Sequence, residues 1–173
     1  MQVLCVFTLL VALAPGSQTP APKPASQTPA PKPASQTPAA PTAAAKGART
    51  VELTGGDDMK YNTTTINAKP GETLHVVLKS TGTVPKIAMA HNFVLLKLGT
   101  DIDAFLKSAM NARETDYVPA DQKAQVVAST KLAGPGETVE ATFKVPAKAG
   151  TYPYMCTFPG HYTAGMKGQL VVQ

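Results

Sequence analysis

Alternating apolar and polar residues predict that the chain from residue 50 onward is built of short β-strands. In the segment 73–79, Leu74, Val76 and Leu78 occupy every second position and therefore share one face of a strand. His75 falls on the opposite face, so we expect its side chain to be exposed to solvent. Similar short runs predict further strands at 51–54, 92–96, 138–145, 151–156 and 169–173.

Turn-forming sequences separate these strands. Clusters containing Gly, Pro or Asp lie at 55–58, 69–72, 134–137 and 147–150. Several short strands at this spacing are typical of an antiparallel β-sandwich. The pattern therefore predicts an all-β domain covering residues 50–173.

Residues 101–112 interrupt the strand pattern with a helical one. Four apolar residues recur at the three- and four-residue spacing of one helix face: Ile102, Phe105, Leu106 and Ala109. Asp101 or Thr100 is available as the N-cap. We predict one short helix in an excursion between two strands, ending near Asn111 and followed by a polar loop at 113–125.

The first 49 residues have a different composition from the rest of the chain. Residues 3–14 form an apolar run of 12, which as a helix would measure about 18 Å and fall short of a bilayer core of roughly 30 Å. We predict that residues 1–14 are a secretory signal peptide or, since no Lys or Arg precedes the apolar run, a membrane tether. Residues 15–49 are rich in Pro, Ala and Lys and repeat the nonapeptide SQTPAPKPA, which predicts a disordered linker. We expect a periplasmic or exported protein, free or tethered to the outer face of the cytoplasmic membrane.

The positive charge of the chain does not indicate a nucleic-acid partner. The net charge is +5, but four of the 16 basic residues precede residue 50, which leaves 12 basic against all 11 acidic residues in the domain. No basic stripe with interleaved aromatic residues remains after that count. We therefore expect no nucleic-acid binding.

One cluster of side chains carries the chemistry of this sequence. Cys156, His161 and Met166 follow the spacing Cys-x4-His-x4-Met, and His91 begins an apolar strand upstream. A thiolate, two imidazoles and a thioether are the donors of a blue-copper site, in which two His and one Cys lie in a plane and a Met binds weakly on the axis. We predict these four residues as the ligands of one copper ion.

Each of these residues has a simpler interpretation when it is taken alone. A single cysteine can pack as a small hydrophobe or act as a nucleophile, and methionine commonly fills gaps in a core. His91 could be an ordinary strand-end histidine, and His161 a surface imidazole. The chain has only three histidines and two cysteines, and Cys5 lies in the leader. The combined spacing therefore favours the metal site, and a single cysteine in the domain allows no internal disulfide.

Several motifs resemble the azurin-like small blue copper proteins of the cupredoxin family. Residues 89–95 (MAHNFVL) are similar to the M-G-H-N-W-V-L strand of azurin, residues 156–161 repeat its C-T-F-P-G-H, and residues 166–168 match its M-K-G. The likeness covers nearly all of residues 51–173. Four residues (162–165) separate the last histidine from the methionine, as in the auracyanins, where azurin has three. The resemblance implies an eight-stranded Greek-key β-sandwich with one type 1 copper ion.

The resemblance also implies how the ligands are supported. Asn92 is expected to join the two ligand segments through Thr157, and the backbone N–H groups of Asn92 and Phe158 are expected to donate to the Cys156 sulfur. A weak carbonyl contact to copper is implied at Ala90, where azurin has glycine.

A docking surface for redox proteins is implied around an exposed edge of His161. Its apolar residues are Met59, Val84, Met89, Phe158 and Pro159, which could alternatively be ordinary core residues.

These observations together predict an exported, monomeric protein that carries single electrons between redox partners. We do not expect an enzyme, because copper oxidases and nitrite reductases need further metal centres that three histidines cannot supply. The main alternative is a copper-binding or copper-delivery module without a role in electron transfer, which favours an open, exchangeable site. A purely structural sandwich would leave the Cys-His-Met spacing unexplained.

Overall fold

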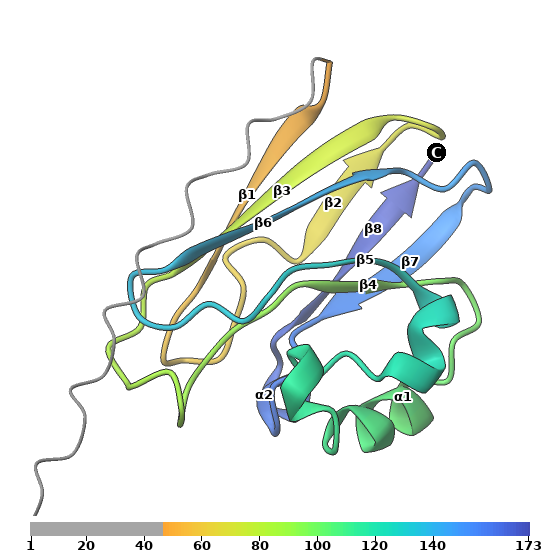
Figure 1. Ribbon diagram of the computed structural model, residues 1–173. Coiled ribbons are helices and arrows are strands. Elements are labelled where there is room, and N and C mark those ends of the chain that lie inside the picture. The colour runs from red at the N-terminus through yellow and green to blue at the C-terminus, as the bar shows by residue number, and fades with distance from the viewer. Residues whose placement is uncertain (1–46) are drawn as a thin grey trace, which may run out of the picture. The chain divides into compact units, whose positions relative to one another are not determined.

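Two β-sheets pack face to face in the computed structural model, which describes residues 47–173 (Figure 1). One sheet has three strands in the order β1 (Arg49–Gly55), β3 (Thr73–Ser80) and β6 (Thr138–Lys144). The other has five, in the order β2 (Thr65–Ala68), β8 (Lys167–Val172), β7 (Gly150–Met155), β4 (Val94–Leu96) and β5 (Val126–Ser129). The predicted leader and residues 15–46 of the predicted linker lie outside the described residues. Strand β1 begins at Arg49, one residue inside the segment assigned to the linker.

The chain passes repeatedly from one sheet to the other, as in the predicted Greek-key sandwich, although β4 is followed by β5, and β7 by β8, in the same sheet. Most strand pairs are antiparallel, as the spacing predicts, but β1 pairs with β3, and β2 with β8, in parallel register. The chain leaves the first sheet after β1, forms β2 in the second sheet and returns as β3. This excursion lets β1 and β3 lie side by side in the same direction.

The core lies between the two sheets and is fully apolar at its centre. Alternation in β1 and β3 turns Leu53 and three residues of β3 inward, where they are at most 1% exposed: Leu74, Val76 and Leu78. They share the core with an aromatic group in which Phe93 stacks on Phe143 of β6 and packs against Tyr154 of the other sheet. Apolar area removed from water contributes about 25 cal/mol per Å² to stability. Burial of this layer therefore stabilises the packing of the two sheets that carry the candidate ligands.

Helical segments gather at one end of the sandwich, where Figure 1 shows both α1 and α2. Helix α1 (Ile102–Ala109) begins as predicted, because the Asp101 carboxylate accepts a hydrogen bond of 3.0 Å from the Ala104 N–H. The segment predicted as a polar loop contains two 3₁₀ helices, Arg113–Thr115 and Ala120–Gln125. Helix α2 covers His161–Ala164. No helix within residues 47–173 has the length and apolar character needed to cross a membrane.

The prediction that His75 is exposed is wrong, since the residue is only 5% exposed. Strand β3 is the central strand of its sheet, so the outer face of His75 is flanked by neighbours on β1 and β6. Its Nδ1 is hydrogen-bonded to the Thr142 hydroxyl at 2.8 Å, and its Nε2 lies 3.5 Å from the Glu140 carboxylate. Alternation in the sequence predicts on which face of the sheet a side chain lies. It does not predict how much of that side chain the residues of neighbouring strands cover.

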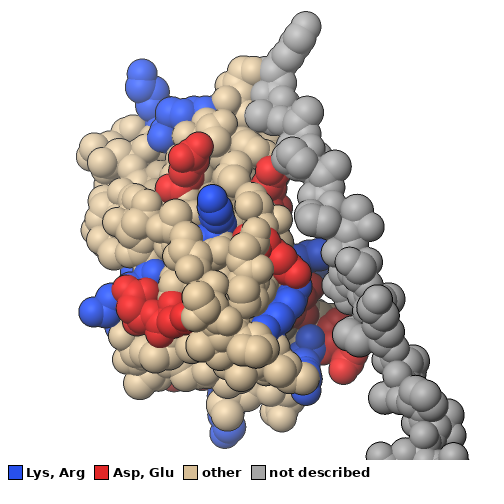
Figure 2. Space-filling model, turned by 90° about the vertical axis from the view of Figure 1, so that its left-hand side faces the viewer, with Lys and Arg blue, Asp and Glu red and all other residues tan. Residues whose placement is uncertain are grey.

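Charged side chains of both signs are interspersed on the face that Figure 2 shows. Two ion pairs among the described residues join distant segments, Arg49 with Glu72 and Lys86 with Glu137. This face therefore has no broad basic area of the kind that binds nucleic acid.

Candidate metal centre

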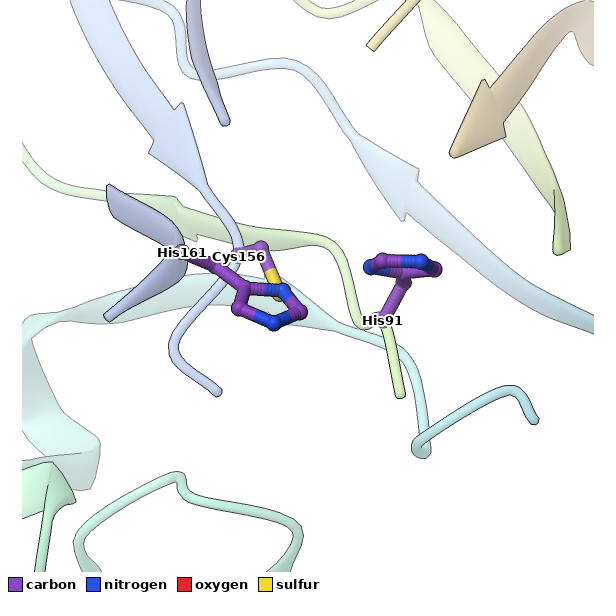
Figure 3. A group of neighbouring side chains, drawn as sticks. All are labelled: His91, Cys156 and His161. Carbon is purple, nitrogen blue, oxygen red and sulfur yellow. The ribbon is translucent and has the colours of Figure 1, made fainter. Parts of the chain in front are cut away.

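Two separate segments bring three donor side chains together (Figure 3). Cys156 directly follows β7, and His161 begins α2 in the same loop. His91 lies before β4, where it forms an isolated antiparallel bridge with Ala133. The backbone N–H groups of His91 and Ala133 each donate to the other residue's carbonyl, at 2.9 and 2.7 Å. The backbone thus holds the histidine on a segment that is separate from the loop of Cys156 and His161.

The donor atoms of His91, Cys156 and His161 all lie within 4.8 Å of one another. The Cys156 Sγ is 3.4 Å from the His161 Nδ1, and the two imidazole ring centroids are 5.1 Å apart. All three side chains are at most 2% exposed. A cluster of one sulfur and two ring nitrogens of this size and burial has the composition of a trigonal copper site.

The ring nitrogens of His91 show whether the cluster fits a metal ion. Both ring nitrogens are buried, and neither forms a hydrogen bond with any group in residues 47–173. Buried polar atoms are nearly always satisfied, because an unpaired one costs roughly 1–3 kcal/mol. A metal ion bound beside Cys156 and His161 would satisfy one of these nitrogens, so the residues present fit a copper ion.

Burial keeps the metal-free donors in their uncharged forms. It raises the pKa of the Cys156 thiol to about 12, although the N–H groups of Asn92 and Phe158 donate hydrogen bonds to the sulfur and act in the opposite direction. Burial also lowers the pKa of His161 to about 4 and lowers that of His91. At neutral pH both imidazoles are therefore unprotonated and able to bind a metal, whereas the thiol must lose its proton when the metal binds.

Asn92 joins the two ligand segments through its side chain. Its Oδ1 accepts a hydrogen bond of 2.9 Å from the Thr157 N–H, and its Nδ2 donates to the Thr157 hydroxyl at 2.8 Å. The same Nδ2 donates to the Asp116 carbonyl at 2.7 Å. Because Asn92 follows His91 and Thr157 follows Cys156, these bonds fix the separation of the two donors.

The ligand loop is closed by backbone hydrogen bonds at both ends. The Cys156 N–H donates to the Met166 carbonyl at 3.0 Å, and the Met166 N–H donates to the His161 carbonyl at 2.9 Å. The helical turn between them starts after Gly160 and stops at Gly165, which have φ angles of 85° and 108°. These are left-handed conformations that favour glycine. The glycines therefore let the chain reverse and bring Met166 back toward Cys156.

Met166 is fully buried beside His91, with the backbone of Gly55 against both side chains. A Cβ built on Gly55 would lie 2.5 Å from the Met166 Cε and 3.3 Å from two atoms of the His91 ring. The absence of a side chain at position 55 therefore leaves the space that the thioether occupies. Sequence reasoning missed this role, because Gly55-Gly56 was interpreted only as a turn; no local pattern shows which distant side chain a glycine faces.

The remaining predicted residues lie around the cluster. The Ala90 carbonyl is 3.9 Å from the Cys156 Sγ, and Phe158 packs on His161 with ring centroids 4.8 Å apart. Among the five predicted docking residues, Pro159 is exposed and the others are half-buried: Met59, Val84, Met89 and Phe158. The prediction that one edge of His161 is exposed is wrong, since this residue is only 2% exposed.

Comparisons with known proteins agree with this geometry. The family of copper-binding proteins described as the plastocyanin/azurin family matches residues 48–173. The chain is 45% identical over 121 residues to outer membrane protein H.8 of Neisseria meningitidis serogroup B, covering 68% of this chain but only 63% of that relative. It is 38% identical over 138 residues to azurin of Pseudomonas aeruginosa, covering 78% of this chain and 90% of azurin. The solved structure of auracyanin A, a blue copper protein of Chloroflexus aurantiacus, matches with a TM-score of 0.65 and 36% identity, covering 73% of this chain and 100% of that structure.

The chain therefore belongs to the plastocyanin/azurin family of copper-binding proteins. Its fold is the cupredoxin sandwich, and its cofactor is copper. The buried His, Cys and His donors are consistent with one type 1 copper ion.

Proposed function

We propose that this protein is a one-electron carrier whose copper ion would be held by His91, Cys156, His161 and Met166. The observation that carries the proposal is the buried convergence of the two imidazoles and the thiol within 4.8 Å. Copper bound there would supply a couple between Cu(II) and Cu(I). The Ala90 carbonyl lies 3.9 Å from the Cys156 Sγ and would add at most a weak contact.

The surrounding residues support electron transfer rather than metal delivery. Asn92 and Thr157 hold the two ligand segments at fixed separation, and none of the three clustered donors is exposed. Such a site holds its ligands in one arrangement, so little reorganisation accompanies a change of charge. A delivery module would instead need donors that open readily to release the ion.

Copper loading of the full chain tests this function directly. We expect an intense thiolate-to-copper visible band in the oxidised protein, lost on reduction and recovered on reoxidation. Cys156→Ser and His91→Gln should abolish that band. The matched control is His75→Gln, because His75 is also a buried histidine but lies outside the cluster. Copper-loaded protein without the band would contradict the proposal, and rapid loss of copper to a mild chelator would favour the delivery module.

The docking surface defined by Met59, Val84, Met89, Phe158 and Pro159 is part of this proposal. It supports brief contact with redox proteins, because Phe158 connects the half-exposed surface to the His161 ring beneath it. Met89→Lys is expected to slow electron self-exchange between oxidised and reduced copies, measured by NMR line broadening. Met110→Lys is the control, since Met110 is a methionine exposed by 65% at the end of α1. Equal rates of electron self-exchange in both variants would contradict the proposed docking surface.

We also propose that the protein works outside the cytoplasm, exported or tethered through its N-terminal segment. The apolar run and the repeat in residues 1–49 support this location, as does the name of the Neisseria relative, outer membrane protein H.8. Cell fractionation with mass analysis of the mature N-terminus tests the proposal. Recovery of the intact chain from the cytoplasm would overturn it.

A further inference from the structure

A buried tyrosine outside the metal cluster is hydrogen-bonded to the segment that carries the ligands. The Tyr61 hydroxyl donates to the Asn92 carbonyl at 2.5 Å, and Tyr61 is 5% exposed. No other hydrogen bond to that carbonyl is formed within residues 47–173. The peptide unit between Asn92 and Phe93 therefore depends on a side chain that lies 31 positions earlier in the sequence.

Asn92 transmits the effect of this bond toward the sulfur. Its N–H donates to Cys156, its side chain bonds Thr157, and its carbonyl accepts from Tyr61. Without the Tyr61 hydroxyl, the buried carbonyl would have to rotate toward another donor. Rotation about the Asn92 backbone would in turn weaken the N–H bond to the sulfur.

Tyr61 also closes the loop that covers the centre. It forms an antiparallel bridge with Gly55, whose backbone lies against Met166 and His91. The Asn62 side chain accepts a hydrogen bond of 2.8 Å from the Thr54 N–H and holds the base of the loop. One phenol thus connects the loop beside Met166 with the segment of His91.

We propose that Tyr61 is a positioning residue that tunes the copper centre through the Asn92 carbonyl. The inference rests on the proposed copper centre. Hydrogen bonds to a metal-bound thiolate withdraw charge from the sulfur and raise the reduction potential. Tyr61 would therefore keep the potential higher than the ligands alone would set it.

The chain supplies a matched control in Tyr154, which is also buried and lies 5.6 Å from Tyr61 between ring centroids. Its hydroxyl likewise donates to a backbone carbonyl at 2.5 Å, but that carbonyl belongs to Thr63, away from the ligands. Tyr61→Phe and Tyr154→Phe each delete one such hydroxyl and keep the ring. Only Tyr61→Phe removes a bond to the ligand segment.

Copper-loaded full chain gives the first measurement. Tyr61→Phe is expected to lower the reduction potential and move the thiolate-to-copper band to longer wavelength, whereas Tyr154→Phe should match the wild type. Replacement of Tyr61 by 3-fluorotyrosine, a stronger donor of the same shape, should shift both quantities in the opposite direction, and it tests the proposal even if Tyr61→Phe does not fold. Identical potentials and bands in wild type, Tyr61→Phe and Tyr154→Phe would overturn it.

The metal-free protein gives a second measurement that does not depend on copper. Amide hydrogen exchange at Asn92 and Phe93 should be about 5- to 30-fold faster in Tyr61→Phe, since a buried hydrogen bond is lost there. Exchange at these amides should be unchanged in Tyr154→Phe. Equally faster exchange in both variants would show that Tyr61 acts only by packing in the core, which would contradict the proposal. A wild-type protein without a blue band would contradict the proposed function instead, so the two failures are distinguishable.

Discussion

At the scale of single residues, the position of Met166 depends on the absence of a side chain at Gly55. A methyl group there would collide with the Met166 Cε at 2.5 Å and press on the His91 ring. Both side chains are completely buried, so neither can move into solvent. Gly55 has no positive φ angle, and its requirement for glycine is therefore one of space and not of backbone conformation.

Gly55→Ala should displace the thioether and perturb the copper centre. Overpacking of a buried site typically costs about 1–3 kcal/mol of unfolding free energy. We expect a changed electron paramagnetic resonance spectrum in the oxidised protein and a lower midpoint in denaturant. Gly56→Ala is the control, because a Cβ there would meet only the flexible ends of Thr81 and Asp58, at 3.2 and 3.3 Å. Equal effects of both variants would contradict this account of Gly55.

At the scale of elements, α2 carries the ligand loop and is anchored by Tyr162. This ring packs against the second apolar cluster, formed around Val94, Phe105 and Met155. The Lys167 ammonium lies 4.4 Å from the ring centroid, which adds a cation–π contact. A four-residue helix has no stability of its own, so the turn between His161 and Met166 depends on this anchor.

Tyr162→Ala should therefore loosen the loop without removing a ligand. Loss of a half-buried aromatic ring is expected to lower the unfolding free energy by about 1–3 kcal/mol and to speed copper loss to a chelator. Denaturant titration and stopped-flow chelation measure the two effects. Thr163→Ala is the matched control, because Thr163 lies on the same turn but is exposed. Copper loss at the wild-type rate in Tyr162→Ala would show that the loop is held by other contacts.

Sequence patterns predicted the elements that have a clear run or period of apolar residues and missed strands that have none. The eight-residue strand β3 and the capped helix α1 were predicted nearly to their ends, and the three-residue strand β4 was predicted from its apolar run. Strands β2 and β5 were missed, because their four residues each show no such pattern. The convergence of His91 with the Cys156 loop was foreseen from donor types. The roles of Gly55 and Tyr61 were not, since they depend on contacts between distant segments.

At the scale of the whole molecule, the buried histidines couple the stability of the metal-free protein to pH. The pKa of His161 falls from 6.5 when it is free in water to about 4 in the fold, because burial disfavours its charged form. Between these values the unfolded chain binds a proton that the folded chain does not. Stability is therefore complete above about pH 6.5 and is lost as the pH falls toward 4.

Acidification from pH 7 to pH 5 should cost the metal-free protein about 2 kcal/mol of unfolding free energy through His161 alone. The lowered pKa of His91 adds to this loss in the same direction. Denaturant titrations at several pH values measure the slope. His161→Gln, which removes the titrating group, should flatten it, and an unchanged slope in that variant would assign the pH dependence to other groups.

The burial of Cys156 also has a consequence for the lifetime of the chain before copper arrives. Oxidants and disulfide partners react with an accessible thiolate, and this sulfur is neither accessible nor ionised at neutral pH, with a pKa of about 12. The metal-free fold thus keeps the Cys156 thiol protonated and unreactive in the oxidising surroundings proposed for the protein. Copper binding would convert this thiol to the thiolate, because the metal displaces the proton on the sulfur.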